Sequence, residues 1–89
     1  MIFNTKGKEI GIYGIFIDNK LVYIGQSKQL SARAQTHERG IRGNHYHNSN
    51  WYGIAHQFYL HGHDITFRVL EEVESDSLIE TEERYINNL

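Results

Sequence analysis

The chain has 89 residues, a formal net charge of −2 and no cysteine. A chain of this length forms one domain, residues 1–89, and leaves no room for a second. Without cysteine there are neither disulfides nor a thiolate zinc site, so the fold depends on its apolar core. No apolar run reaches the ~18 residues of a membrane span, and the N-terminus lacks the zones of a secretion signal. We therefore expect a cytoplasmic protein with no membrane partner.

Charged residues are unevenly distributed along the chain. Residues 20–47 hold five Lys or Arg and one Glu, whereas residues 71–84 hold seven acidic residues and one Arg. Because Lys and Arg neutralise phosphate, the first segment is the one suited to face a nucleic acid, and most of the second is a solvated helix face. A net-acidic domain of this size should bind a duplex weakly alone, so we expect a tethered binding domain, a partner chain or self-association.

The first regular segment is a hairpin. Apolar and β-branched residues alternate over residues 10–17, which predicts a strand, and residues 21–24 are its partner across a turn at residues 18–20. Tyr13 and Tyr23 lie ten residues apart in these strands. A hairpin of this kind holds both phenols at fixed places on one small sheet.

A helix follows the hairpin. Ser27 is suited to cap its start, and Gly40 is a good C-terminal stop. Residues 41–47 have no clear period and predict a loop. The helical spacing is carried by Leu30, Ala34 and His37.

A second helix begins at a cap provided by Asn48 or Asn50 and ends at Gly62. Residues 65–69 alternate apolar and polar side chains, which predicts a third strand. The apolar stripe of the second helix comprises Trp51, Ile54, Ala55, Phe58 and Tyr59.

The last helix runs to the end of the chain. Ser77 with Glu80 three residues later resembles a capping box, although Ser75 or Asp76 could start the helix instead. The order of strands and helices predicts an α/β fold in which a small three-stranded antiparallel-type sheet is flanked by helices.

Glu82 lies within the apolar stripe of this last helix. At 100° per residue, the stripe spans an arc of about 100° with Glu82 near its middle. A carboxylate there is costly to desolvate unless a cation, a metal or a hydrogen-bond donor meets it. The alternatives are a Glu at the edge of a short helix or one paired with a structural Arg. The stripe comprises Leu78, Tyr85, Ile86 and Leu89.

Two short motifs allow these separate signals to be interpreted together. They are Gly11-Ile12-Tyr13 and Tyr23-Ile24-Gly25. With them, the chain resembles the GIY-YIG nuclease superfamily from Gly11 to Ile86, and its second motif is closest in style to phage and intron homing endonucleases. That resemblance implies a bacterial or phage-infected cell. The other matching elements are Gln26-Ser27-Lys28, Arg33 ten residues after Tyr23, His37 four residues later, and Glu82 three residues before Tyr85-Ile86.

One expected element has no counterpart. The family usually carries an Asn beyond the glutamate helix, and Asn87 and Asn88 lie too close to Glu82 for that role. We expect either a chain truncated after Leu89 or a member without this supporting residue.

The resemblance implies a DNA endonuclease that hydrolyses phosphodiesters of double-stranded DNA with Mg²⁺ or Mn²⁺. Glu82 would bind the metal, Arg33 would grip the scissile phosphate, and Tyr13 would activate the attacking water. His37 would relay the proton and Tyr23 would orient water or phosphate; which of the three acts as general base stays open. The candidate contacts to the DNA backbone are Lys28, Arg39 and Arg42.

Two other functions remain open. A noncatalytic nucleic-acid-binding or inhibitory module on the same scaffold would suit the acidic balance. A zinc-binding structural domain is a third reading, with loop histidines as ligands. Those histidines are His45, His47, His61 and His63.

Overall fold

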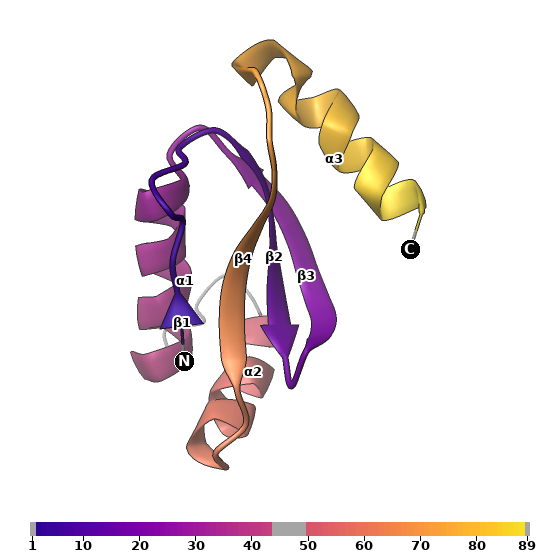
Figure 1. The fold of residues 1–89 in the computed structure, drawn as a ribbon. Helices are drawn as coiled ribbons and strands as arrows, with labels where there is room; N and C mark the ends of the chain where they lie inside the picture. The colour runs from indigo at the N-terminus through magenta and orange to yellow at the C-terminus, as the bar shows by residue number, and fades with distance from the viewer. Residues whose placement is uncertain (1, 44–49, 89) are drawn as a thin grey trace.

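The computed structural model describes residues 2–43 and 50–88. Its elements in chain order are β1 (Ile2–Phe3), β2 (Gly11–Ile17), β3 (Lys20–Ser27), α1 (Leu30–Gly43), α2 (Asn50–Leu60), β4 (Ile65–Glu72), the 3₁₀ helix η1 (Ser75–Ser77) and α3 (Leu78–Asn87). Figure 1 shows the sheet in the centre, with α1 to its left, α3 to its right and α2 near the hairpin turn at the lower end. None of the helices in the described ranges has the length and apolar character needed to span a membrane.

The sheet has the strand order β1-β4-β2-β3. β2 is antiparallel to both β3 and β4, which confirms the predicted three-stranded antiparallel sheet. β1 adds a short parallel strand beside β4 that the sequence did not predict. A two-residue strand is too short to show an alternating pattern, and the ring of Phe3 stacks on Phe67 of β4 with centroids 5.7 Å apart.

The hairpin turn lies where the sequence predicts it. Asp18 and Asn19 both have positive φ, at 50° and 68°. Two left-handed residues are what a type I′ turn requires, and Asn and Asp tolerate that conformation better than other side chains. The turn fixes the pairs Ile17–Lys20 and Phe16–Leu21, and a register shift between Ile15 and Phe16 then places Ile15 opposite Tyr23 and Tyr13 opposite Gly25.

The main core lies between the sheet and the helices α1 and α2. Alternation along β2 turns Tyr13 and Ile15 toward this core, while Ile12 is buried on the other face. α3 packs against β2 and β3 and buries Leu78 and Thr81. The core cluster comprises Tyr13, Ile15, Leu30, Ala34, Ile41, Ala55, Ile65 and Phe67.

Helix α1 does not stop at Gly40. It continues to Gly43, so the predicted loop is wrong for residues 41–43. Gly40 is buried within the helix, where a Cβ would lie 2.6 Å from the Tyr52 ring. The glycine therefore allows α2 to approach α1 closely. Residues 44–49, which include Asn48 and the rest of the predicted loop, lie outside the described residues.

The end of α2 at Gly62 is confirmed. Gly62 has φ +84°, its amide donates to the Tyr59 carbonyl and the His63 amide donates to the Phe58 carbonyl. These are the two bonds of a Schellman motif, for which glycine is the preferred left-handed residue.

The predicted capping box at Ser77 is wrong. The Ser77 side chain makes no capping hydrogen bond, and its backbone, at φ −104° and ψ 1°, lies outside the extended conformation of a typical N-cap. The 3₁₀ helix η1 also bonds the Ser77 amide to the Glu74 carbonyl, so that amide is not available to Glu80. Thr81 Oγ1 instead donates to the Ser77 carbonyl at 2.7 Å. Ser27 likewise does not cap α1 directly; its Oγ accepts from the Gln29 amide in the turn before the helix.

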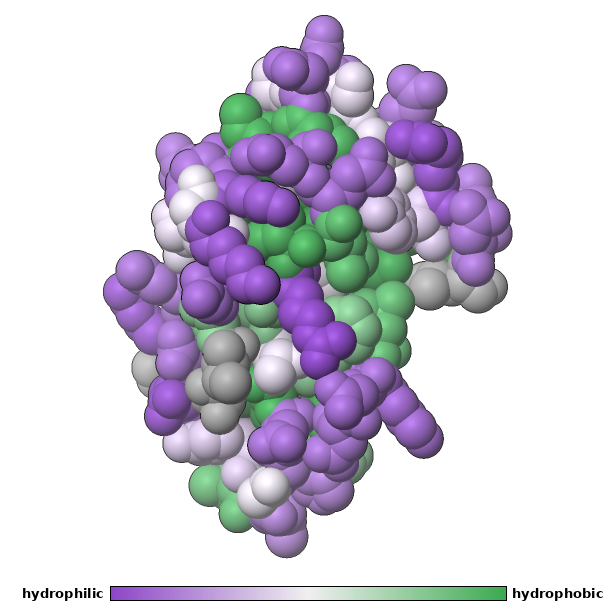
Figure 2. Space-filling model, in the orientation of Figure 1, coloured by the Kyte–Doolittle hydropathy of each residue, from purple (hydrophilic) through white to green (hydrophobic). Residues whose placement is uncertain are grey.

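Two of the predicted apolar stripes are rotated from their expected positions. On α2, Ile54 and Phe58 are 61% and 39% exposed, whereas Ala55 is buried. On α3, Ile86 is 49% exposed and Thr81 is buried instead. On the face shown in Figure 2, hydrophilic residues surround a band of hydrophobic ones near the middle of the molecule. The residues of α2 that pack against the core are Trp51, Tyr52, Ala55 and Tyr59.

Candidate active site

An open pocket of ≈ 500 Å³ brings together side chains from four elements. Tyr13 comes from β2, Tyr23 from β3, Arg33 from α1 and Glu82 from α3. Four of the five catalytic candidates thus line one pocket. The remaining lining residues are Gly25, Gln26, Ser27 and Lys28.

A larger cavity of ≈ 690 Å³ lies elsewhere and has the opposite character. Four carboxylates line it together with one guanidinium, that of Arg84. A phosphate would be repelled by such a wall, so size alone does not identify the functional pocket. These carboxylates belong to Glu9, Glu71, Glu72 and Glu74.

The hairpin register explains why the two phenols share one face. Tyr13 is paired with Gly25 and Ile15 with Tyr23, so the two tyrosines lie diagonally across the strands. Their ring centroids are 6.0 Å apart. A Cβ at Gly25 would collide with the phenol of Tyr13, and its ideal position lies 2.5 Å from Cζ. Only glycine leaves room for the Tyr13 ring to lie across β3.

His37 is buried behind the first phenol and uses both ring nitrogens. Its Nε2 lies 2.8 Å from the Tyr13 hydroxyl, and its Nδ1 lies 2.6 Å from the Tyr52 hydroxyl. His37 is only 3% exposed. It lies one turn beyond Arg33 on α1, as predicted, but it reaches the pocket only through Tyr13.

Burial governs the protonation of these groups. It raises the pKa of Tyr13 far above that of a free phenol, with a further increase from Tyr23 that Arg33 partly offsets. Burial also lowers the pKa of His37 to about 4, and the nearby Arg33 charge acts in the same direction. The pKa of Tyr52 is raised, again by burial first. Near neutral pH all three side chains are therefore uncharged.

Trp51 covers the second phenol, a contact that the sequence did not predict. Its indole stacks on the Tyr23 ring with centroids 4.8 Å apart and an interplanar angle of 14°. The sequence placed Trp51 on the core stripe of α2, but nothing in it indicated which ring of the sheet would lie beneath. The contact between Tyr52 and His37 was not predicted for the same reason.

Glu82 and Arg33 supply opposite charges to the pocket. Arg33 is exposed, and Glu82 is half-buried on α3. Within residues 2–43 and 50–88, no ion pair involves Glu82, which disfavours the reading of a Glu paired with a structural Arg. Tyr85, on the same helix as Glu82, donates its hydroxyl hydrogen to the carboxylate of Glu71.

No described group of three or more His, Asp or Glu side chains is arranged to hold a metal. A single carboxylate beside an open pocket still fits Mg²⁺ or Mn²⁺, because hard cations of this kind take oxygen ligands and keep several waters. Glu82 is the acidic side chain among the pocket residues.

The three candidate DNA contacts differ in their surroundings. Lys28 lines the pocket, and Arg39 lies exposed further along α1. Arg42 is engaged: its Nε donates to Glu38 at 3.0 Å and its guanidinium contacts the Tyr59 hydroxyl at 3.2 Å. An exposed pair of this kind contributes little to stability, so DNA could displace it at low cost.

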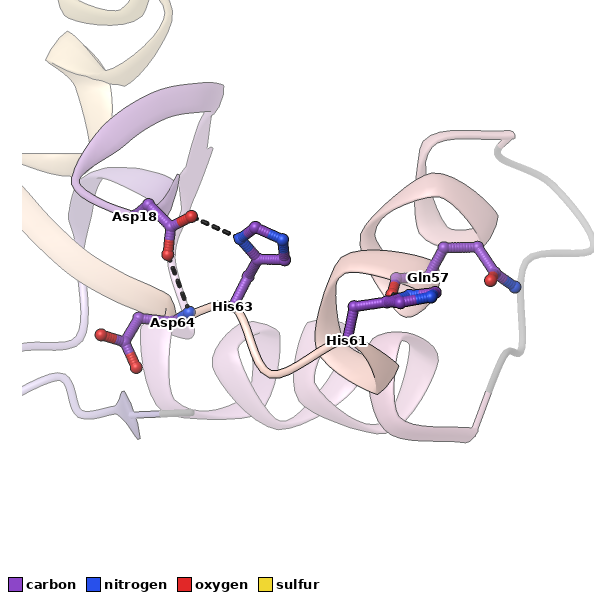
Figure 3. A network of polar contacts seen from close by, with 5 residues as sticks. All are labelled: Asp18, Gln57, His61, His63 and Asp64. Carbon is purple, nitrogen blue, oxygen red and sulfur yellow. Dashed lines mark hydrogen bonds and ion pairs between the residues drawn. The ribbon is translucent and has the colours of Figure 1, made fainter.

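The loop histidines serve other contacts where they are described. His63 bonds to the Asp18 carboxylate, which also accepts from the Asp64 amide, so that the hairpin turn is tied to the start of β4 (Figure 3). These bonds lower the pKa of Asp18. His61 Nδ1 lies 2.7 Å from the Gln57 carbonyl. His45 and His47 lie outside the described residues, so the zinc reading stays a prediction.

The pocket therefore combines two phenols, a guanidinium and a carboxylate at a four-stranded sheet flanked by helices. Comparison with family models finds the GIY-YIG catalytic domain over residues 9–89. No curated protein and no solved structure matches the chain. The chain belongs to the GIY-YIG nuclease superfamily.

Proposed function

We propose that this protein is a divalent-metal-dependent DNA endonuclease that hydrolyses a phosphodiester in the pocket between β2, β3, α1 and α3. One observation carries the proposal: Tyr13, Tyr23, Arg33 and Glu82 come from four separate elements and line the same open pocket. Core packing accounts for the position of Tyr13 and in part for that of Tyr23, but it gives no reason for a guanidinium and a carboxylate from two other elements to lie at the same open pocket.

Arg33 binds the scissile phosphate. Its guanidinium is exposed at the pocket, so its fork of donors is free to meet two phosphoryl oxygens. The charge also offsets the negative charge that builds up in the transition state. Lys28 lies at the same pocket and holds the adjoining backbone as a point charge.

Glu82 would hold Mg²⁺ or Mn²⁺ through its carboxylate. The chemistry supplied at that position would be positive charge that polarises a phosphoryl oxygen and stabilises the leaving oxygen. Glu82 would thereby add the charge of the metal to that of the Arg33 guanidinium at one phosphate.

Tyr13 takes the proton of the attacking water. Because its phenol is neutral near pH 7, it acts as a base only while its own proton moves to another group. His37 Nε2, 2.8 Å away, is that group. Tyr23 lines the pocket and orients the water, and Trp51 holds the Tyr23 ring in place.

Nicking of supercoiled plasmid with Mg²⁺ or Mn²⁺ tests this proposal. Glu82→Gln and Arg33→Ala should each reduce the rate on the order of 10²-fold or more. Glu83→Gln is the matched control, since Glu83 is exposed on the same helix and does not line the pocket. Cleavage that survives both site changes would refute the proposed site.

A noncatalytic nucleic-acid-binding or inhibitory module is the second candidate, favoured by the net charge of −2. It predicts that the protein binds duplex DNA but never cuts it, whichever divalent ion is supplied. For the nuclease we expect weak binding by the isolated domain, with recruitment by a tethered domain, a partner chain or a second copy. Gel shift and nicking on one labelled duplex distinguish the two.

A further inference from the structure

Tyr52 completes a chain of three hydrogen-bonding rings that starts at the pocket. The Tyr13 hydroxyl lies 2.8 Å from His37 Nε2, and the Tyr52 hydroxyl lies 2.6 Å from His37 Nδ1. The three residues come from β2, α1 and α2. Tyr13 and His37 are buried, whereas Tyr52 is half-buried. The chain therefore leads from the pocket toward a less buried phenol on another helix.

The position of Tyr52 is closely defined by its packing. Its ring lies against Gly40 on α1, where a Cβ would come within 2.6 Å of Cε2. The ring also meets the His37 imidazole edge-on, with centroids 5.5 Å apart and an interplanar angle of 86°. This contact holds the Tyr52 hydroxyl in line with Nδ1.

The chemistry of a neutral imidazole gives this chain a direction. One ring nitrogen carries a proton and donates, and the other accepts. If Nδ1–H donates to Tyr52, Nε2 is free to accept the Tyr13 proton. If Nε2 carries the proton instead, Tyr13 has no acceptor in His37 and cannot release its proton in that direction. The Tyr52 hydroxyl can accept from Nδ1–H or donate to a bare Nδ1, so the role it takes sets whether Nε2 can accept the Tyr13 proton.

We propose that Tyr52 is a positioning residue that holds His37 as the Nδ1–H tautomer and passes the water proton onward from Tyr13 to solvent. This rests on the proposed nuclease function. The attacking oxygen forms a bond to phosphorus as the bond from phosphorus to the leaving 3′ oxygen breaks. The water proton moves to Tyr13, the Tyr13 proton to Nε2, the Nδ1 proton to Tyr52, and the Tyr52 proton to bulk water; the leaving alkoxide takes a proton from solvent.

This relay avoids charges that burial disfavours. A direct transfer from Tyr13 to His37 would leave a phenolate or an imidazolium, and burial opposes both by raising the Tyr13 pKa and lowering that of His37. In the relay all three rings are neutral before and after the step. The other charged or titratable groups that act on the chain are Tyr23 on β3 and Arg33 on α1. The positive charge of Arg33 further opposes an imidazolium.

The tautomer can be measured without any cleavage. ¹⁵N NMR of the histidine-labelled protein at pH 7 should show His37 protonated at Nδ1 and bare at Nε2. Tyr52→Phe keeps the ring against Gly40 and removes only the hydroxyl, so the proton should move to Nε2 in part or entirely. Tyr59→Phe on the same helix is the matched control and should leave His37 unchanged. Protonation of His37 at Nε2 in the unaltered protein, or no response to Tyr52→Phe, would overturn the proposal.

Cleavage kinetics test the relay itself. Tyr52→Phe should lower kcat on the order of 10-fold or more with KM unchanged, since the residue acts on proton transfer and not on DNA binding. In a His37→Gln background the same change should have no further effect. A proton inventory in H₂O/D₂O mixtures should be strongly curved for the unaltered protein and less curved for Tyr52→Phe, because the variant loses the two transfers that pass through the Tyr52 hydroxyl.

The outcomes separate this inference from the nuclease proposal. A protein with the expected tautomers that cuts no DNA with any divalent ion would refute the nuclease and the relay, and would leave the tautomer-setting contact of Tyr52 in place. An active enzyme whose kcat survives Tyr52→Phe would refute the relay and leave the nuclease standing.

Discussion

The buried His37 should make the protein unusually sensitive to mild acid. In the folded state its pKa is lowered from 6.5 to about 4, first by burial and then by the Arg33 charge. Between these two values the unfolded chain binds a proton that the folded chain does not. The free energy of unfolding therefore falls as the pH drops from 6.5 toward 4, and the contribution is fully present above 6.5.

The size of the effect follows from the difference between the two pKa values. At 1.36 kcal/mol per pKa unit, the full shift corresponds to about 3 kcal/mol. For a domain of 89 residues this is a large share of a total stability that is typically about 5–15 kcal/mol. Most of the loss should occur by pH 4.5. Tyr13 and Tyr52, the phenols that bond to His37, have raised pKa values and stay uncharged in this window.

Urea denaturation at pH 7.5 and pH 4.5 measures this loss. The comparison is between the unaltered protein and His37→Gln, which cannot titrate but can still bond to Tyr13 and Tyr52. Carboxylates contribute equally to both proteins and cancel in the difference. The unaltered protein should lose roughly 2–3 kcal/mol more than the variant. Equal losses in the two proteins would show that His37 titrates normally and would contradict the buried, neutral imidazole.

Two glycine substitutions should each lower the free energy of unfolding, for different physical reasons. Gly25→Ala adds a methyl group that meets the Tyr13 phenol, so it should cost about 1–3 kcal/mol by overpacking and also abolish nicking by displacing the Tyr13 hydroxyl from His37. Gly62→Ala meets nothing within 4 Å but sits at φ +84°, so it should cost about 1–2 kcal/mol of unfolding free energy and leave the nicking rate unchanged. Chemical denaturation measures the stability of each variant, and the plasmid assay measures its nicking rate. A stable, active Gly25→Ala protein would contradict the packing argument. A large activity loss in Gly62→Ala would contradict the expectation that this position affects stability alone.

The hairpin was the most predictable part of the fold because local chemistry determines it. Alternation marks both strands, and the Asp18-Asn19 pair supplies the two left-handed residues of the turn. The turn alone would pair Gly14 with Tyr23 and leave the two tyrosines on opposite faces; the register shift between Ile15 and Phe16 brings them to one face, and no sequence pattern predicted that shift. The placement of Arg33 and His37 one turn apart on α1 was predictable from helical spacing alone.

Contacts between distant elements were not predictable from these patterns. Gly40 looked like a helix stop, because a glycine after a periodic run is the usual signal for one. Its role instead depends on Tyr52, which reaches it from another helix. β1 depends on pairing with β4, more than sixty positions away, and has too few residues for a pattern. The hydrogen bond between His37 Nδ1 and Tyr52 likewise depends on how α2 packs against α1, which the sequence pattern does not show.

Glu82 lies at the pocket for a reason that the helical wheel gave only in part. The helical wheel placed it within an apolar stripe, but Ile86 of that stripe is exposed and Thr81 replaces it in the buried face. Glu82 is half-buried because α3 packs along β3 and turns this carboxylate toward the pocket. The cost of desolvation that the wheel predicted is therefore reduced by the open side of the pocket.

The distribution of cations explains how an acidic domain could act on DNA. Lys28 and Arg33 lie at the pocket, whereas Arg42 is paired with Glu38, and Arg68 donates to Asn19. In the proposed function Lys28 and Arg33 would hold one phosphate and its neighbour, which neutralises too little charge for tight binding of a duplex. If the proposed function holds, the domain would cleave DNA that a tethered domain, a partner chain or a second copy brings to it, and that recruiting element would set the affinity and the choice of target.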